Sequence, residues 1–130
     1  MESRPRPQIA LVEDDDEIRA LVSALLAREG MDAHACRTAA DFDALVQRIP
    51  VDMALVDIML PGEDGLSILR RLAARGGLPV IMLSAKGLEL DSKTLKEDLG
   101  ILDIVFKPFS PRELIKTIQY HLDQAPAVAE

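Results

Sequence analysis

A chain of 130 residues with a net charge of −7 is long enough to bury the core of one domain. Hydrophobic residues make up 48% of the chain and charged residues 28%, which is typical of soluble globular proteins, and no apolar run approaches the ~20 residues of a membrane-spanning helix. The acidic balance argues against direct nucleic-acid binding, because neutralising phosphate groups requires a patch of Lys and Arg.

The N-terminal segment and the cysteine content indicate a cytoplasmic protein. No apolar core follows the basic residues near the N-terminus, so we expect no signal peptide. The single cysteine, Cys36, cannot form an internal disulfide, and we interpret it as a small, partly buried apolar residue. We expect one domain over residues 8–123, between a flexible N-terminus at 1–7 and a flexible tail or linker start at 124–130.

The first part of the chain alternates between strand and helix patterns. Residues 9–12 are a short apolar run, typical of a buried strand. Five consecutive acidic residues follow at 13–17, an unusual place for a solvated tail. Apolar residues then recur over 18–26 at the spacing of one helix face, and Gly30 provides the expected helix stop. A second, shorter strand is expected at 32–36.

The middle of the chain repeats this order. Residues 38–41 resemble a capping box with Asp in place of Glu, and they begin a helix that Pro50 ends. The third strand is expected at 53–56 and delivers Asp57 at its carboxyl end. Pro and Gly residues then mark a loop, and the apolar spacing predicts a helix over 66–73.

The last part contains two further strand and helix pairs. A continuous apolar run at 79–83 predicts the fourth strand, which ends at Ser84, and a weaker helical pattern covers 88–99. A fifth strand at 103–106 leads to Lys107. The final helix has a strong start signal, which consists of Ser110 as N-cap, Pro111 as the first helical residue and Glu113 as the third.

This order of elements predicts both a fold and the place of a site. Five strands alternating with five helices favour an α/β fold with a parallel sheet covered on both faces. Sites in such sheets form at the carboxyl ends of the strands, at a topological switch point. The chemically distinctive residues all fall at that edge, namely Glu13 and Asp14 after the first strand, Asp57 after the third, Ser84 after the fourth and Lys107 after the fifth.

These residue types together favour phosphoryl chemistry. Carboxylates gathered within a few Å repel one another unless a cation lies among them, and Mg²⁺ is the natural candidate because it prefers oxygen ligands. Asp57 can then act as a nucleophile toward phosphorus and form an acyl phosphate. Lys107 would neutralise charge on the phosphoryl oxygens, and the Ser84 hydroxyl would donate a hydrogen bond to one of them.

Four short motifs stand in a characteristic order. They are Leu11-Val12-Glu13-Asp14-Asp15, Asp57-Ile58-Met59-Leu60-Pro61-Gly62-Glu63-Asp64-Gly65, Ser84-Ala85 and Lys107-Pro108-Phe109. With these motifs, the chain resembles the receiver domain of two-component response regulators over roughly residues 8–123. The resemblance implies a doubly wound, flavodoxin-like (βα)5 fold with strand order 2-1-3-4-5. It also implies a Lys-Pro peptide that is often cis.

The resemblance also implies a role for each residue at the edge. Asp57 would be the phosphoacceptor, Ser84 would move toward the phosphoryl group, and Lys107 would pair with it. The Mg²⁺ ligands would be Asp14 directly, Glu13 through water, Asp57, and the main-chain carbonyl of Met59.

The function implied is that of a signalling switch. The family accepts a phosphoryl group from a sensor histidine kinase or a histidine phosphotransfer protein, and it catalyses its own phosphorylation and dephosphorylation. We therefore expect this phosphodonor and a downstream protein target as partners, with no nucleic-acid or membrane partner. The chain would be a monomer or a phosphorylation-dependent homodimer. It would act on its own, which we favour, or as the N-terminal part of a longer protein.

The chain departs from the common family pattern near the expected output face. Ile104 stands where the family usually has Tyr or Phe, so no aromatic ring reports the switch from this position. The segment 84–107 is also slightly longer than usual, near the helix expected at 88–99. In the family, the side chains at the positions that match Met59 and Lys86 tune the lifetime of the acyl phosphate, and an apolar Met59 with a basic Lys86 leaves that lifetime open.

Three other functions fit part of the pattern. A haloacid-dehalogenase-type phosphohydrolase also uses an Asp nucleophile and Mg²⁺, but it needs room for a cap and a second Asp two residues later, where this chain has Met59. A flavodoxin-like cofactor binder would need a Gly, Ser and Thr-rich loop after the first strand rather than a run of acids. A degenerate receiver that works only through protein contacts would not need the acceptor residues, all of which are present.

The remaining polar residues have simpler interpretations. Asp15 and Asp16 are expected to be the N-cap and a first-turn residue of the first helix, where the helix dipole favours acids. His34 and His121 are expected at the surface or its rim, and His121 is favoured near a helix C-terminus.

Overall fold

The computed structural model describes residues 6–58, 65–75, 78–85 and 100–124. Within these ranges, five parallel strands form one sheet in the order β2-β1-β3-β4-β5. The strands are β1 (Gln8–Val12), β2 (Asp32–Cys36), β3 (Met53–Asp57), β4 (Val80–Ala85) and β5 (Asp103–Lys107). The helices are α1 (Asp16–Arg28), α2 (Ala39–Arg48), α3 (Gly65–Arg75) and α5 (Pro111–Gln124). The predicted fold and strand order are confirmed, whereas the helix expected at 88–99 lies outside the described residues.

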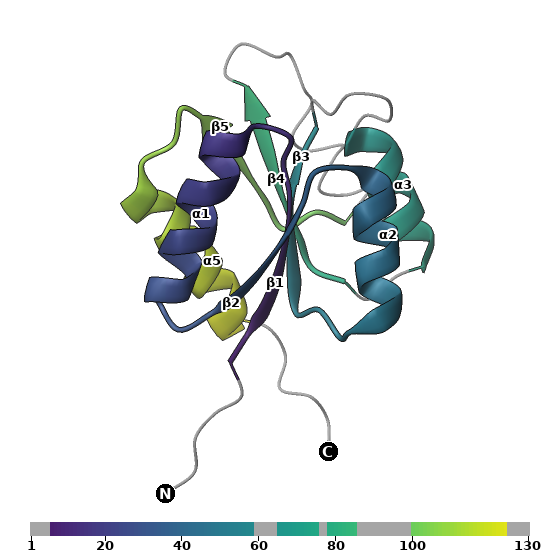
Figure 1. Cartoon of the computed structure of the whole chain (residues 1–130), viewed down its shortest axis with the longest axis horizontal. Coiled ribbons are helices and arrows are strands. Elements are labelled where there is room, and N and C mark those ends of the chain that lie inside the picture. The colour runs from purple at the N-terminus through teal and green to yellow at the C-terminus, as the bar shows by residue number, and fades with distance from the viewer. Residues whose placement is uncertain (1–5, 59–64, 76–77, 86–99, 125–130) are drawn as a thin grey trace, which may run out of the picture.

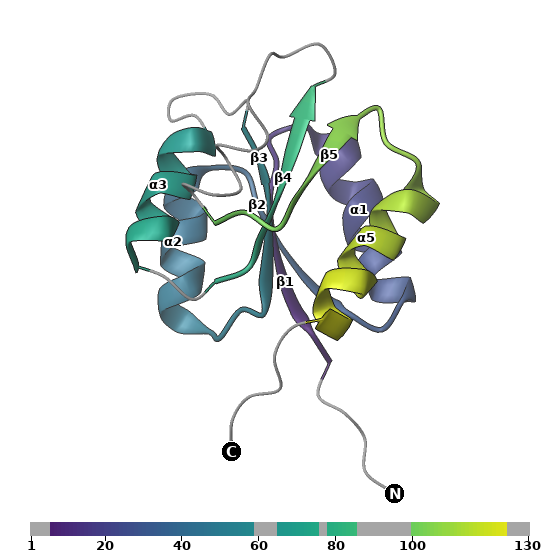
Figure 2. The same cartoon turned by 180° about the vertical axis from the view of Figure 1, so that it is seen from behind.

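Helices pack on both faces of the sheet. As Figures 1 and 2 show, α1 and α5 lie on one face and α2 and α3 on the other. Side chains alternate between the faces along each strand. Ile9 and Leu11 of β1 therefore pack into the cluster shared with α1 and α5, while Ala10 and Val12 pack into the cluster shared with α2 and α3. This double coverage explains why the strands read as continuous apolar runs rather than as alternating patterns.

Side-chain caps begin three of the helices where the sequence predicts them. The Asp15 carboxylate accepts hydrogen bonds from the backbone N–H groups two and three residues later, at 2.9 and 3.0 Å. The hydroxyls of Thr38 and Ser110 each accept one from the N–H group three residues later, at 3.1 and 3.4 Å. Each such cap stabilises its helix by about 1 kcal/mol. After α1, Gly30 has a φ of 83°, a conformation that glycine adopts without strain.

The ends of some strands and helices differ from those that the hydropathy pattern predicts. The β4–β5 ladder pairs Ser84 with Phe106 and Ala85 with Lys107, so both strands continue past their apolar runs. α3 begins at Gly65, one residue before the helix that the apolar spacing predicts over 66–73. Hydropathy reports burial and not backbone pairing, so it marks the ends of elements less closely than their middles.

Leu55 tests how much the centre of the sheet contributes to stability. It lies in β3, is 0% exposed, and belongs to the cluster packed against α1 and α5. Leu55→Ala should lower the free energy of unfolding by about 2–5 kcal/mol, because it leaves a cavity between covered strands. Leu21→Ala on α1, where the residue is 46% exposed, should change it by less than about 0.5 kcal/mol. Urea denaturation followed by circular dichroism measures both values, and equal losses would contradict the core position of Leu55.

Candidate functional site

Three polar side chains are buried at the carboxyl end of the sheet. Glu13 follows β1 and is 0% exposed, Asp57 ends β3 at 3%, and Ser84 lies near the end of β4 at 0%. In the described part of the chain, these are the buried residues that are polar or charged. Burying a carboxylate is unfavourable unless it is paired, so this edge must supply compensating charges.

The strand register brings these residues to one level. Val12 pairs with Val56 in the β1–β3 ladder, which places Glu13 level with Asp57. The last residue of β4 pairs with Lys107 at the end of β5. β1 and β3 are neighbours although β2 lies between them in the chain, so the strand order reverses at this point. The site therefore lies at the topological switch point of the sheet.

An ammonium group joins the two buried carboxylates. Lys107 Nζ donates a hydrogen bond to Glu13 Oε1 at 2.7 Å and another to Asp57 Oδ2 at 3.0 Å. The second carboxylate oxygen of Glu13 accepts a hydrogen bond from the backbone N–H of Asp15 at 3.1 Å. The Lys107 side chain is 19% exposed, so water screens its interactions with both acids only weakly.

Burial and charge pairing shift the pKa values of two of these groups, Glu13 and Lys107. Burial raises the pKa of Glu13, and the negative charge of Asp57 adds to this effect, while hydrogen bonds from Lys107 and from the Asp15 N–H oppose it. Burial alone would lower the pKa of Lys107, but its hydrogen bonds to Glu13 and Asp57 outweigh burial, and the pKa is raised. Lys107 therefore stays protonated at neutral pH, and a positive charge is always present between the acids.

A third carboxylate completes an acidic pocket that can bind a metal ion. Glu13, Asp14 and Asp57 each place one carboxylate oxygen within 4.8 Å of the others. Asp14 is partly exposed, so the pocket opens to solvent on its side. Carboxylate oxygens are the donors that hard divalent cations prefer, and a cation at this point would offset the repulsion among the acids.

Comparison with protein families matches residues 9–119 to the response regulator receiver domain. The chain belongs to this family. The sheet order and the acidic pocket described above agree with that assignment.

Solved structures of receiver domains superpose on this one over most of its length. A CheY-like receiver domain protein from Methanospirillum hungatei is 27% identical, with a TM-score of 0.84 over 92% of this chain and 96% of that chain. The beryllofluoride-activated N-terminal receiver domain of RstA from Klebsiella pneumoniae is 31% identical, with a TM-score of 0.77 over 88% and 97%. NtrX from Brucella abortus is 28% identical, with a TM-score of 0.83 over 92% of this chain, which spans 28% of the NtrX chain.

The structure of this receiver domain brings most of the predicted site residues together. Glu13, Asp14, Asp57 and Lys107 meet at one point, and Ser84 is buried at the same edge. Met59 lies outside the described residues. The Lys107–Pro108 peptide is cis, as the resemblance implied. In the described ranges, no helix combines the length and apolar character that crossing a membrane would require.

Sequence reasoning missed Arg19, which contacts the loop carrying the acidic pair. Its Nη1 donates hydrogen bonds to the main-chain carbonyls of Glu13 and Asp14, and its Nη2 pairs with Asp16. A positive charge near the start of a helix is disfavoured by the helix dipole. This unfavourable position, three residues after an acid on the same helix, was the signal that Arg19 has a local partner.

The histidines and Ile104 lie away from the acidic pocket. His121 is at the rim, as expected, but its Nε2 is also 3.0 Å from Asp103 Oδ2, which ties α5 to β5. His34 Nε2 is 2.7 Å from the side-chain oxygen of Gln8. Ile104 is partly buried and packs against the cluster shared with α2 and α3.

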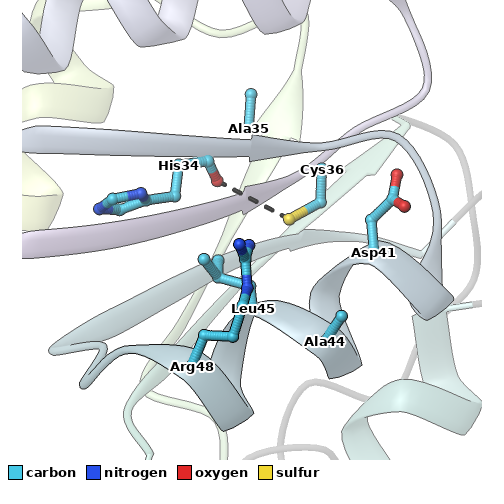
Figure 3. Close-up of a pocket in the computed structure, with 7 residues that line it drawn as sticks. All are labelled: His34, Ala35, Cys36, Asp41, Ala44, Leu45 and Arg48. Atoms are coloured by element: carbon cyan, nitrogen blue, oxygen red, sulfur yellow. Dashed lines mark hydrogen bonds between the residues drawn. The ribbon is translucent and has the colours of Figure 1, made fainter.

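A separate hollow of about 400 Å³ lies between β2 and α2, and the residues that line it differ in chemistry from those of the acidic pocket (Figure 3). Cys36 lines it, together with Asp41, Leu45 and Arg48 of α2. The Cys36 thiol contacts the carbonyl oxygen of His34 at 3.9 Å. Burial, reinforced by the negative charge of Asp41, raises the pKa of the thiol to about 11. Cys36 is therefore a buried, weakly reactive side chain, where the sequence predicted a small, partly buried apolar residue.

Alkylation kinetics test this description of Cys36. The pKa is raised from 9.0 to about 11, so the folded chain holds roughly 100-fold less thiolate at pH 8 than a free thiol would. Iodoacetamide should therefore modify the native chain at least about 100-fold more slowly than the chain unfolded in urea, as measured by intact mass. Equal rates in the two states would show that the Cys36 thiol is not buried and that its pKa is not raised.

Proposed function

We propose that this receiver domain accepts a phosphoryl group on Asp57 in a Mg²⁺-dependent reaction, and that the modification switches its contacts with a downstream protein. The observation that carries the proposal is the position of Lys107 Nζ, within hydrogen-bond distance of Glu13 and of Asp57, beside an acidic pocket that can bind a metal ion. Phosphoryl transfer depends mainly on positioning and on stabilising charge, and this arrangement provides both.

The residues of the pocket divide the chemistry among them. Glu13, Asp14 and Asp57 would hold Mg²⁺, together with the main-chain carbonyl of Met59, and the ion would neutralise charge on the phosphoryl oxygens. A carboxylate oxygen of Asp57 attacks the phosphorus of a phosphohistidine. The P–N bond breaks, and the nitrogen leaves with its electron pair and takes a proton. The product is an acyl phosphate on Asp57.

Two further side chains would stabilise the phosphoryl group during transfer. The Lys107 ammonium, now beside Asp57 Oδ2, donates to a phosphoryl oxygen, and the Ser84 hydroxyl donates to another. The same groups would serve hydrolysis, in which water attacks phosphorus and releases inorganic phosphate. The chain would thus catalyse its own phosphorylation and dephosphorylation, with Met59 and Lys86 setting the lifetime of the acyl phosphate.

The expected partners follow from this chemistry. A sensor histidine kinase or a histidine phosphotransfer protein would supply the phosphoryl group in the cytoplasm, and a downstream protein would read the modified state. Residues 8–123 would form the functional unit, as a monomer or a phosphorylation-dependent homodimer. Because Ile104 is aliphatic and packed against α2 and α3, the downstream signal would not depend on rotation of an aromatic ring at this position.

The alternatives gain less support from the described residues. A flavodoxin-like cofactor binder needs N–H groups that face a phosphate after β1, but the Asp15 N–H donates to the Glu13 carboxylate instead. A receiver that acts only through protein contacts has no need for Lys107 to be placed between two buried acids.

Asp57→Asn tests the phosphoacceptor directly. The wild-type chain with Mg²⁺ and phosphoramidate should gain the mass of one phosphoryl group, EDTA should prevent this gain, and hydroxylamine should remove the group. Asp57→Asn should gain no mass, because an amide is not a nucleophile toward phosphorus. Asp43→Asn is the matched control, since Asp43 pairs with Arg71 outside the pocket, and it should react like wild type. An unlabelled wild type, or a labelled Asp57→Asn, would refute the proposal.

Lys107→Ala separates charge stabilisation from metal binding. We expect a rate of phosphorylation about 10²-fold lower, because a cation beside the reacting group is lost. Mg²⁺ affinity should be equal to or higher than that of wild type, because Lys107 no longer competes for oxygens of Glu13 and Asp57. Quenched time courses with phosphoramidate give the rate of phosphorylation, and calorimetric titration with Mg²⁺ gives the affinity. A wild-type rate would exclude Lys107 from the reaction.

A further inference from the structure

The guanidinium of Arg19 holds the loop that carries the acidic pair. Arg19 Nη1 donates hydrogen bonds to the carbonyl oxygen of Glu13 at 3.1 Å and to that of Asp14 at 3.3 Å. Its Nη2 forms an ion pair with Asp16. The Arg19 side chain is only 18% exposed, although it starts near the beginning of α1. A long cationic side chain in this position is folded back onto the loop instead of extending into water.

These contacts restrict the backbone of Asp14. The Glu13 carbonyl belongs to the peptide plane before Asp14, and the Asp14 carbonyl belongs to the plane after it. Each plane is rigid, so holding both carbonyls with one guanidinium restricts φ and ψ of Asp14 and hence the direction of its Cα–Cβ bond.

Backbone groups at the start of α1 also contact this loop. The Asp15 N–H donates to Glu13 Oε2 at 3.1 Å, and the Asp15 carbonyl accepts from the Arg19 backbone N–H at 2.9 Å. The Glu13 carboxylate is therefore oriented by the Asp15 N–H at the helix start, and the backbone of Asp14 is held by Arg19. Arg19 also places a positive charge behind a run of acids that would otherwise repel one another.

We propose that Arg19 is a positioning residue for the Mg²⁺ ligands Glu13 and Asp14, acting through their main-chain carbonyls. The inference rests on the proposed function of the acidic pocket. A planar guanidinium donates to two carbonyls and a carboxylate at once, whereas the single ammonium of a lysine does not reproduce this fork.

Mg²⁺ calorimetry on the full chain tests this role with three variants. Arg19→Ala should raise the Mg²⁺ dissociation constant about ten-fold or more, the usual effect of removing a group that orients a metal ligand. Arg19→Lys should raise it by a smaller factor, because charge is kept and the fork is lost. Arg28→Ala is the matched control, since it removes the same charge from the exposed last turn of α1, and it should leave the dissociation constant unchanged.

The Mg²⁺ dependence of phosphorylation distinguishes positioning from general stability. In Arg19→Ala, the Mg²⁺ concentration for half-maximal reaction with phosphoramidate should rise, while the rate at saturating Mg²⁺ stays close to wild type. A purely structural role would lower the melting temperature without Mg²⁺ and leave the dissociation constant of the folded protein unchanged. If Arg19→Ala does not fold, the Mg²⁺ dissociation constant of Arg19→Lys decides between the positioning role and the purely structural role.

The possible results separate the two proposals. Wild-type Mg²⁺ affinity in the folded Arg19 variants would overturn the role of Arg19 and leave the proposed function intact. A wild-type chain that binds Mg²⁺ but is not phosphorylated would refute the proposed function, and the calorimetric comparison would still decide on Arg19. A wild-type chain that binds no Mg²⁺ would overturn both.

Discussion

The arrangement of the site depends on one cation between two buried acids. The ammonium of Lys107 lies within hydrogen-bond distance of Glu13 and of Asp57, and it joins the ends of β1, β3 and β5. An uncompensated carboxylate in a covered α/β sheet would be strongly destabilising. Removing one partner of a buried ion pair destabilises a protein more than replacing the whole pair by apolar residues. In the proposed function, the same cation would provide positive charge where a phosphoryl group brings negative charge.

The sheet order explains why the cation and the acids meet at all. β1 and β3 are adjacent because the chain turns to β2 on one side and then continues on the other. This reversal opens the crevice at the carboxyl ends in which Glu13 and Asp57 lie level with each other. The helices contribute through their ends, since the start of α1 holds the acidic loop through Asp15 and Arg19. At the other edge of the sheet, the contact between His121 and Asp103 ties α5 to β5, the strand that carries Lys107.

The hollow beside Cys36 shows by contrast what a site needs. It offers space, but its thiol is protonated at neutral pH and its charged residues, Asp41 and Arg48, have opposite signs. The acidic pocket instead gathers three carboxylates, two of which belong to buried residues. This difference in electrostatics separates a pocket that can hold a metal ion from a gap at the edge of a sheet.

Local chemistry alone determined the elements of this receiver domain and the side of the sheet on which its chemistry lies. Apolar runs predicted the strands, capping residues such as Asp15 and Ser110 predicted the helix starts, and parallel topology placed the acids of the pocket at one edge. These features depend on neighbours in sequence or on a general rule of α/β folds. Only the tertiary structure decided that Lys107 reaches both Glu13 and Asp57, that Arg19 folds back onto the acidic loop, and that His121 contacts Asp103. Such contacts depend on distances between atoms set by strand register and side-chain rotamers, and residue spacing along the chain does not encode them.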